Sequence, residues 1–237
     1  DAKVAKVEKT KDGIIAHVET KDGKSQQIAG DKLISAVGVQ CNIEGIGLET
    51  VGVKTERGAI VIDAYGKTNV DGIWAIGDVA GQPMLAHKAA HQGRAAVEAL
   101  AGEPAVFEPR AIPAVVFTDP EVAWAGLTET EAKQQGRTIE KAMFPWAASG
   151  RAQSIGRTEG LTKWIIEPGS ERLLGCGIVG AGAGDLIGEA VLAIEMGCTA
   201  RDVSESIHPH PTLTETLGFA AEVYYGTATD LYRPKRK

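Results

Sequence analysis

Hydrophobic and polar positions alternate along the start of the chain, which is typical of short β-strands with one buried face. The turn sequences that end in Gly13 and Gly23 divide this region, and Gly38 closes it. The expected strands are Val4–Glu8, Ile14–Glu19 and Lys32–Val37. The pattern predicts a small antiparallel meander over residues 2–38, and three short strands bury so little surface that they need a larger partner.

The next stretch is rich in loops until an apolar run reaches an acidic residue. Ala59–Asp63 is one expected strand, and Gly72–Asp78 is a second, buried strand that ends at a glycine and an acid. Met84–Leu100 is rich in alanine and free of proline, and Gly102 follows it, so we expect a helix there. The order predicted for this stretch is strand, acidic turn, helix.

Three prolines within 104–113 indicate a linker before a region with a different pattern. Strands come first in that region and helices follow, which predicts an α+β domain. The expected strands are Ala114–Phe117, Val122–Ala125, Ile139–Phe144, Leu161–Ile166 and Leu173–Val179. The expected helices are one opened by the capping-box sequence Thr128–Glu131, then Asp185–Met196, Ala200–Ser206, and a last helix from the His-Pro sequence to Tyr225.

Composition narrows the functional classes. The chain has 237 residues and a net charge of −6, which argues against binding to nucleic acid or to anionic membranes. No apolar run approaches the roughly 20 residues of a membrane-spanning helix. Three cysteines, without metal or redox spacing and without a signal peptide, indicate a cytoplasmic compartment of bacterial type. The chain opens on Asp1 rather than Met, so we expect a piece of a longer polypeptide.

The stretch that most strongly suggests chemistry lies near the C-terminus, in the sequence His208-Pro209-His210-Pro211-Thr212-Leu213-Thr214-Glu215. An imidazole beside a carboxylate is a common arrangement for general acid–base catalysis. The spacing leaves two interpretations open. Either Glu215 orients His210, or Thr212 and Glu215 form a capping box that only satisfies the start of a helix. A glutamate used in a cap is less free to orient an imidazole.

A second candidate site lies around Asp78. An acid at the carboxyl end of a strand is well placed to bind a sugar or ribityl hydroxyl, and the backbone N–H groups of Met84–Ala86 can donate to a ligand carbonyl or anion. The alternative is a plain helix cap and a tightly packed helix. His87 and His91 have the spacing of metal ligands, but no acidic residue nearby completes a site, so we expect no metal.

Together these motifs resemble those of the flavoprotein disulfide reductases. Residues 72–101 resemble the second flavin-contacting segment of that family, and residues 111–237 resemble its dimerisation domain. The motifs that carry the resemblance are Ala75–Asp78, Gly81–His87, Thr118–Ala123, Phe144–Ala152 and His208–Glu215. Within the family the chain is most similar to the dihydrolipoamide dehydrogenases, because glutathione reductases typically have a pair of glutamates where Glu215 here stands alone before Thr216.

The resemblance implies a mixed fold, α/β and α+β. Residues 1–38 would be the last part of an NAD-binding domain, residues 39–110 the second part of an FAD-binding domain, and residues 111–237 a complete dimerisation (interface) domain. The implied cofactors are FAD and NAD. The family's redox disulfide, Cys-x4-Cys, and its Gly-rich dinucleotide motifs do not occur in this sequence, so the resemblance implies the C-terminal half of such an enzyme.

The resemblance also implies roles for individual residues. His210 would be the acid/base that deprotonates dihydrolipoamide, Glu215 would hold its imidazole, and His208 would matter less. Asp78 would bind the ribityl chain of FAD, and the backbone of Ala86 would contact the isoalloxazine. Further cofactor contacts are implied at Met84, Leu85 and His87 for FAD, and at Val4 and Gly38 for NAD.

Partners are implied as well. In this family the His–Glu pair serves the active site of the other subunit, which implies a homodimer. The whole enzyme would oxidise dihydrolipoamide on lipoyl domains of 2-oxo acid dehydrogenase complexes, or of the glycine cleavage system, and would reduce NAD⁺. No nucleic acid or membrane partner is implied. The alternatives are a reductase of glutathione or mercury, a transhydrogenase, or a dimerisation fragment without catalytic activity.

Overall fold

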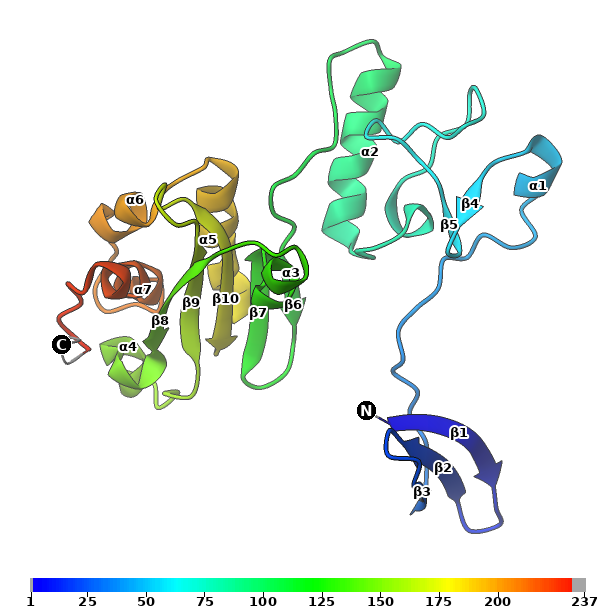
Figure 1. The fold of residues 1–237 in the computed structure, drawn as a ribbon, viewed down its shortest axis with the longest axis horizontal. Helices are drawn as coiled ribbons and strands as arrows, with labels where there is room; N and C mark the ends of the chain where they lie inside the picture. Colours follow the sequence, from blue (N-terminus) through cyan, green and yellow to red (C-terminus); the bar gives the residue numbers. More distant parts are fainter. Residues whose placement is uncertain (1, 232–237) are drawn as a thin grey trace. The chain divides into compact units, whose positions relative to one another are not determined.

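The computed structural model of this chain describes residues 2–231. It divides into two units, Asp1–Asn42 and Ile43–Lys237. The first unit is an antiparallel meander in the order β1-β2-β3 (Figure 1). Its strands are β1 (Ala2–Lys9), β2 (Ile14–Thr20) and β3 (Ser25–Gly30).

The meander is confirmed, but the third strand expected at 32–37 is wrong. After β2 a tight turn, in which Gly23 N–H donates to Thr20 O at 2.9 Å, returns the chain at once into β3. Pairing runs to the start of β2, where Gly30 lies opposite Ile14. Residues 32–37 have therefore passed the last β2 residue that could pair with them, and they lie in irregular structure.

Residues 43–110 fold into short elements and one long helix. The elements are α1 (Leu48–Val51), β4 (Thr55–Glu56), β5 (Ala59–Ile60), the 3-10 turn η1 (Gly77–Ala80) and α2 (Ala86–Leu100). Val53, Ile60 and Ala75 form a small buried cluster. The predicted helix is confirmed, although it begins at Ala86 rather than Met84.

Two strands expected in this part are corrected by the structure. The strand expected at Ala59–Asp63 forms only over its first two residues, as β5. The buried strand expected at Gly72–Asp78 is wrong, because Trp74 makes an isolated bridge to Lys67 and no strand is assigned over 72–78. Gly77 then takes a φ of 71°, which turns the backbone into η1. Asp78, which we expected at the end of a strand, thus lies in the 3-10 turn η1.

Residues 111–231 form an antiparallel five-stranded sheet in the order β6-β7-β10-β9-β8, with helices packed against it. Its strands are β6 (Ala114–Val116), β7 (Glu121–Gly126), β8 (Glu140–Pro145), β9 (Leu161–Ile166) and β10 (Leu173–Gly180). Its helices are α3 (Glu129–Gln134), η2 (Trp146–Ala148), α4 (Gly150–Ser154), α5 (Ala183–Glu195), α6 (Ala200–Glu205) and α7 (Glu215–Tyr225). Every expected strand forms, and the capping box at Thr128 is confirmed.

One face of this sheet is the main core. Ala125, Cys176 and Trp164 lie opposite one another on β7, β10 and β9, so their side chains share a face. On that face Trp164 Nε1–H donates to Leu217 O of α7 at 3.0 Å. The helix α5 packs against β7 and β10, and α7 packs against β8 and β9 (Figure 1). The buried cluster of this half joins the sheet to α5, α6 and α7.

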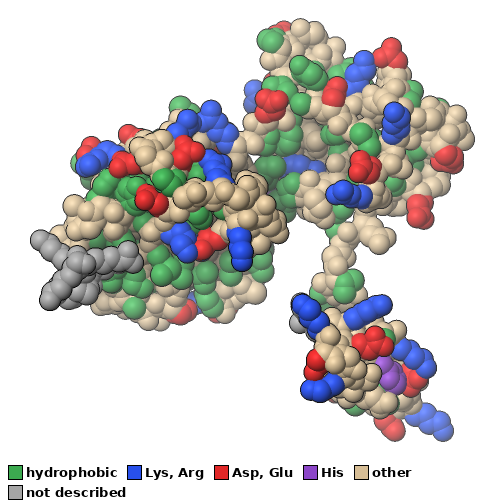
Figure 2. All heavy atoms as spheres, viewed as in Figure 1, with side chains coloured by type: hydrophobic (Ala, Val, Ile, Leu, Met, Phe, Trp, Pro, Cys, Tyr) green, Lys and Arg blue, Asp and Glu red, His purple; other side chains and the backbone are tan. Residues whose placement is uncertain are grey.

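The opposite face of the sheet is less covered. Trp124 of β7 is 37% exposed and Met143 of β8 is 40% exposed. On the same face Lys141 and Lys163 pair with Glu129 of α3 at 2.6 Å each. Positive and negative side chains are interspersed over the surface visible in Figure 2. Among residues 2–231, no helix has the length and apolar character needed to cross a bilayer.

Candidate active site

The side chains of His210 and Glu215 meet at the start of α7. His210 Nδ1 lies 2.9 Å from Glu215 Oε1. The Glu215 side chain is 10% exposed, whereas the His210 side chain is 77% exposed. The pair therefore combines a carboxylate held inside the protein with an imidazole that faces solvent.

Glu215 also closes the turn before α7. Its other oxygen, Oε2, accepts a hydrogen bond from Thr212 N–H at 2.8 Å. Orienting His210 and capping the turn are therefore not alternatives, because the carboxylate uses a different oxygen for each. The last helix begins at Glu215 rather than at the His-Pro sequence, and Thr212 Oγ1 donates to Pro209 O at 2.6 Å instead of capping a helix N–H.

This geometry selects one tautomer of His210. A carboxylate can only accept hydrogen bonds, so the contact with Glu215 Oε1 places the imidazole proton on Nδ1. Nε2 is then the basic nitrogen. The carboxylate also stabilises the imidazolium that forms when Nε2 takes up a proton. The pair can therefore act as a general base, and then as a general acid, toward a group that approaches from outside.

His208 makes a second and more buried imidazole–carboxylate pair. Its Nε2 lies 2.7 Å from Glu189 Oε1 on α5, and its Nδ1 lies 2.9 Å from Ser206 O. The hydrogen bond to Glu189 raises the pKa of His208, although burial of the ring opposes this. Because both ring nitrogens are engaged, His208 holds its loop against α5 rather than presenting a basic nitrogen.

Asp78 lies on the turn η1, which α2 holds in place. Lys88 Nζ donates to Gly77 O at 2.8 Å and to Gly81 O at 2.9 Å. Gln92 Oε1 accepts from Gly77 N–H at 2.8 Å. Both of these α2 side chains are buried. The exposed Asp78 therefore has a defined backbone position even though it does not end a strand.

The start of α2 fits the polar edge of a ligand. Its N-cap is Leu85, and no side chain caps the first turn. Ala86 and His87 of that turn are exposed, and Met84 and Leu85 are half-buried. Uncapped N–H groups at the positive end of a helix dipole suit a carbonyl or an anion. With the carboxylate of Asp78 nearby in sequence, these residues suit a flavin, which has both a polar ring edge and ribityl hydroxyls.

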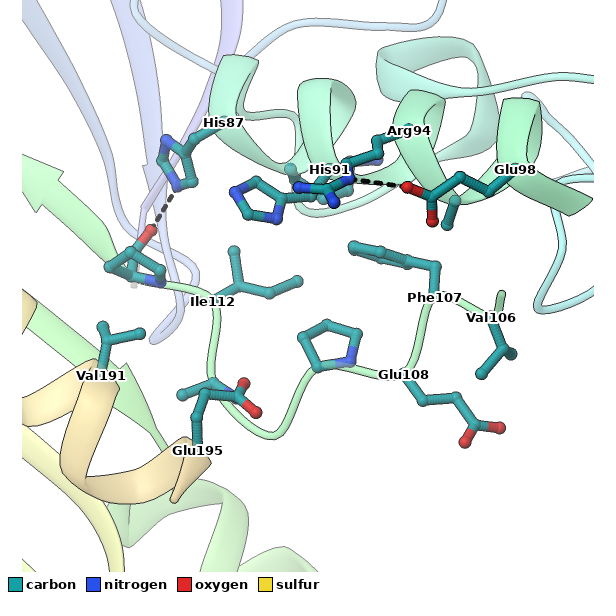
Figure 3. Close-up of a pocket in the computed structure, with 15 residues that line it drawn as sticks. His87, His91, Arg94, Glu98, Val106, Phe107, Glu108, Ile112, Val191 and Glu195 are labelled. Atoms are coloured by element: carbon teal, nitrogen blue, oxygen red, sulfur yellow. Dashed lines mark hydrogen bonds and ion pairs between the residues drawn. The ribbon is translucent and has the colours of Figure 1, made fainter. Parts of the chain in front are cut away.

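One face of α2 borders a pocket of about 550 Å³ (Figure 3). His87 Nε2 lies 2.7 Å from Pro113 O in the pocket wall. His91 points from α2 toward Ile112 (Figure 3). Across the pocket, Glu195 Oε1 accepts from the backbone N–H groups of residues 110 and 111 at 2.8 and 3.0 Å. Within the described part of the chain, no group of His, Cys, Asp and Glu is arranged to hold a metal ion.

The two residues expected at an NAD site lie in separate segments of the first unit. Val4 is on β1 and is 54% exposed. Gly38 follows β3 in irregular structure with a φ of 102°. Nothing lies within 4 Å of the position that a Cβ of Gly38 would take. Their role in binding NAD stays a prediction.

Sequence reasoning missed the residues that hold these groups, namely Lys88, Gln92 and Glu189. For the first two a signal existed, because a lysine and a glutamine at i, i+4 on an alanine-rich helix share one face with its apolar positions. Burial of a lysine requires hydrogen-bond partners, which the turn carbonyls provide. For Glu189 there was no signal, since only the tertiary fold brings α5 against His208.

Two family profiles match the chain. Residues 1–93 match the profile described as pyridine nucleotide-disulphide oxidoreductase, and residues 112–221 match the dimerisation domain of the same family. Among curated relatives, the dihydrolipoyl dehydrogenase of Vibrio cholerae is 47% identical over 238 residues, which are 100% of this chain and 50% of that protein. That of Rhizobium etli is 50% identical over 227 residues, covering 95% and 47%. The chain spans about half the length of the curated relatives it matches.

Solved structures agree with this grouping. LpdA from Mycobacterium tuberculosis superposes with a TM-score of 0.82 at 28% identity, covering 93% of this chain and 48% of that one. The HOCl-induced flavoprotein disulfide reductase RclA from Escherichia coli superposes with a TM-score of 0.80 at 27% identity, covering 91% and 49%. The structural similarity therefore extends over more than nine-tenths of this chain.

Proposed function

Because the chain belongs to the pyridine nucleotide-disulphide oxidoreductase family, we propose that it forms one half of a dihydrolipoyl dehydrogenase. In this proposal His210 is the acid/base and Glu215 is the carboxylate that orients it. The observation that carries the proposal is the 2.9 Å contact between His210 Nδ1 and Glu215 Oε1, in which the imidazole is exposed and the carboxylate is buried. Relatives of that name at 47% and 50% identity support the choice of substrate.

The proposed reaction converts dihydrolipoamide and NAD⁺ into lipoamide, NADH and a proton. Both S–H bonds of the substrate break, an S–S bond forms, and two electrons leave the dithiol. His210 Nε2 takes the proton of one S–H, which makes the more nucleophilic thiolate. Glu215 Oε1 holds the resulting imidazolium through Nδ1–H, and Nε2–H can then return the proton to a departing thiolate or to water.

The proposal includes two cofactors. FAD, when bound, would supply the redox chemistry that connects the family's redox disulfide, which this sequence does not contain, to NAD⁺. Asp78 would bind its ribityl hydroxyls, and the backbone of Ala86 would contact the isoalloxazine, with Met84, Leu85 and His87 around it. Val4 and Gly38 would contact NAD. The supporting observations are the fixed turn η1 and the uncapped first turn of α2.

The proposed assembly is a homodimer in which His210 serves the dithiol site of the other subunit. Its support is the match of residues 112–221 to a dimerisation domain. The proposed protein substrates are the lipoyl domains of 2-oxo acid dehydrogenase complexes or of the glycine cleavage system. A cytoplasmic location, where the thiols stay reduced, agrees with the three free cysteines.

The direct test is His210→Gln in the full-length protein that contains these residues, assayed with dihydrolipoamide and NAD⁺. Loss of a main acid/base should lower the rate by about 10²–10⁴-fold. The matched control is His91→Gln, an exposed imidazole on α2, which should leave the rate within about twofold. A His210→Gln enzyme as fast as the wild type would remove His210 from the mechanism.

Substrate choice separates the proposal from its alternatives. A related reductase would reduce glutathione disulfide or mercuric ion faster than it oxidises dihydrolipoamide. Absorbance at about 450 nm in the purified 237-residue chain would show that it retains flavin by itself, as the cofactor's own property. A colourless, stable dimer without activity would favour a pure dimerisation role for the isolated chain.

A further inference from the structure

A series of buried hydrogen bonds runs from the sheet to the start of α7. Trp146 Nε1 lies 3.0 Å from Thr162 Oγ1, and Thr162 Oγ1 lies 2.8 Å from Thr216 Oγ1. Thr216 Oγ1 in turn lies 2.7 Å from Leu213 O. The three side chains are each 0% exposed. These hydrogen bonds therefore link η2 and β9 to the turn that carries Glu215.

The two end groups of this series fix which atom donates and which accepts in each hydrogen bond. An indole N–H can only donate, and a backbone carbonyl can only accept. Thr216 O–H must therefore donate to Leu213 O, Thr162 O–H must donate to Thr216, and Trp146 N–H must donate to Thr162. With water excluded, each bond polarises the next, and no member can rotate without leaving a buried group unpaired.

The last acceptor of this series, Leu213 O, lies in the turn that carries Glu215 of the proposed catalytic pair. Leu213 O also accepts from Thr216 N–H at 3.1 Å, which closes the turn of residues 213–216. Glu215 lies inside that turn, and its Oε2 accepts from Thr212 N–H. In this turn the side chain of Thr216 points into the core, and that of the preceding residue, Glu215, points to His210. Fixing the first fixes the backbone from which the second extends.

We infer that the Thr216 hydroxyl, held by Thr162 and Trp146, is a positioning group for the acid/base function of His210. It touches no reacting atom. It sets the backbone of the 213–216 turn, so that Glu215 Oε1 meets His210 Nδ1 while Oε2 remains on Thr212. This inference rests on the proposed role of His210.

The variant that tests it is Thr216→Val in the full-length enzyme. Valine keeps the shape of threonine and puts a methyl group in place of the hydroxyl. Thr162 O–H then loses its acceptor, and Leu213 O keeps only the backbone N–H of Thr216. A displacement of the carboxylate by a fraction of an ångström should lower kcat by about tenfold, because a 1 Å misplacement can cost about 10²-fold. The KM for dihydrolipoamide should stay within about twofold, since no substrate contact changes. Thr216→Ser restores the hydroxyl and should restore kcat.

The matched control is Thr68→Val, which makes the same change at another buried threonine. Thr68 is 7% exposed, and its Oγ1 donates to Ile73 O at 2.8 Å, away from α7. It should lower the melting temperature by a similar amount without lowering kcat. Equal effects of the two variants on kcat would show that Thr216 contributes only general stability and would overturn the inference.

Two further results keep this inference separate from the proposed function. If the wild type oxidises dihydrolipoamide and His210→Gln abolishes the rate, but Thr216→Val does not change it, the inference fails while the proposed function stands. If the wild type does not oxidise dihydrolipoamide, the proposed function fails. A crystal structure of Thr216→Val then still decides the geometry, because retention of the 2.9 Å contact between His210 and Glu215 would contradict the inference.

Discussion

Glu215→Gln is the substitution whose effect follows most directly from the geometry. The carboxylate accepts two hydrogen bonds, from His210 Nδ1–H and from Thr212 N–H. A glutamine of the same shape offers one acceptor oxygen and one NH₂ donor. Thr212 N–H is a backbone donor and cannot change its role, so the amide oxygen stays with it. The NH₂ group then faces His210 Nδ1.

That reversal selects the wrong tautomer of His210. Nδ1 must now accept, the imidazole proton moves to Nε2, and the outward nitrogen can no longer act as a base. The imidazolium also loses its carboxylate. In serine proteases the corresponding Asp→Asn change costs about 10⁴-fold. We expect Glu215→Gln to lower kcat by about 10²–10⁴-fold.

The assay is kcat for dihydrolipoamide oxidation by Glu215→Gln and Glu215→Ala in parallel. Alanine presents no group to Nδ1, so part of the His210 population keeps its basic Nε2, and this variant should be faster than the glutamine variant. The Glu215→Ala variant should unfold more readily than Glu215→Gln, because Thr212 N–H loses its acceptor. The expected cost is about 1 kcal/mol. A glutamine variant within a few-fold of the wild-type kcat would refute the tautomer reasoning.

Two further predictions concern stability. The hydrogen bond to Glu189 raises the pKa of His208 above its unfolded value near 6.5, so the resulting stabilisation is fully present below that pH and is lost as pH rises through the folded pKa. Glu189→Gln should therefore destabilise by about 1 kcal/mol at a pH of about 5.5 and by less at about 9, as chemical denaturation at both values would show, and an equal loss at both would contradict the ion pair. A Cβ at Gly180 would lie 2.2 Å from Cζ3 of the buried Trp146, so Gly180→Ala should destabilise by about 1–3 kcal/mol or more. Gly177→Ala on the same strand is its control, since nothing lies within 4 Å of that Cβ, and similar melting temperatures for the two variants would refute the clash.

The fold of residues 111–231 was predictable because each of its strands carries its own signal. Leu161–Ile166 is a short run rich in β-branched and aromatic residues, and Thr128 with Glu131 marks a helix start by local hydrogen bonds alone. The run Gly72–Asp78 carries the same apolar signal, yet it forms no strand. A strand needs a partner at hydrogen-bonding distance, and composition cannot report whether one is present.

The catalytic candidate was predictable for a similar reason, since His210 and Glu215 lie within one turn of backbone and can meet without help from distant residues. The precision of that meeting was not predictable. It depends on Thr162, far along the chain, which contacts Thr216 only because β9 and α7 pack together. No local pattern distinguishes this threonine from the other threonines of the sequence.

The two sides of the His210–Glu215 pair are held differently, and this difference indicates how the site works. The side of the pair that faces the protein is fixed, since Glu215 is 10% exposed and bonded through both oxygens. The side that faces outward is open, because His210 is 77% exposed. A base surrounded by water exchanges protons with solvent and gains little from its oriented carboxylate, whereas exclusion of water strengthens the same contacts. Orientation therefore comes from this subunit's own core, and desolvation must come from the surface that approaches His210, which in the proposed homodimer belongs to the other subunit.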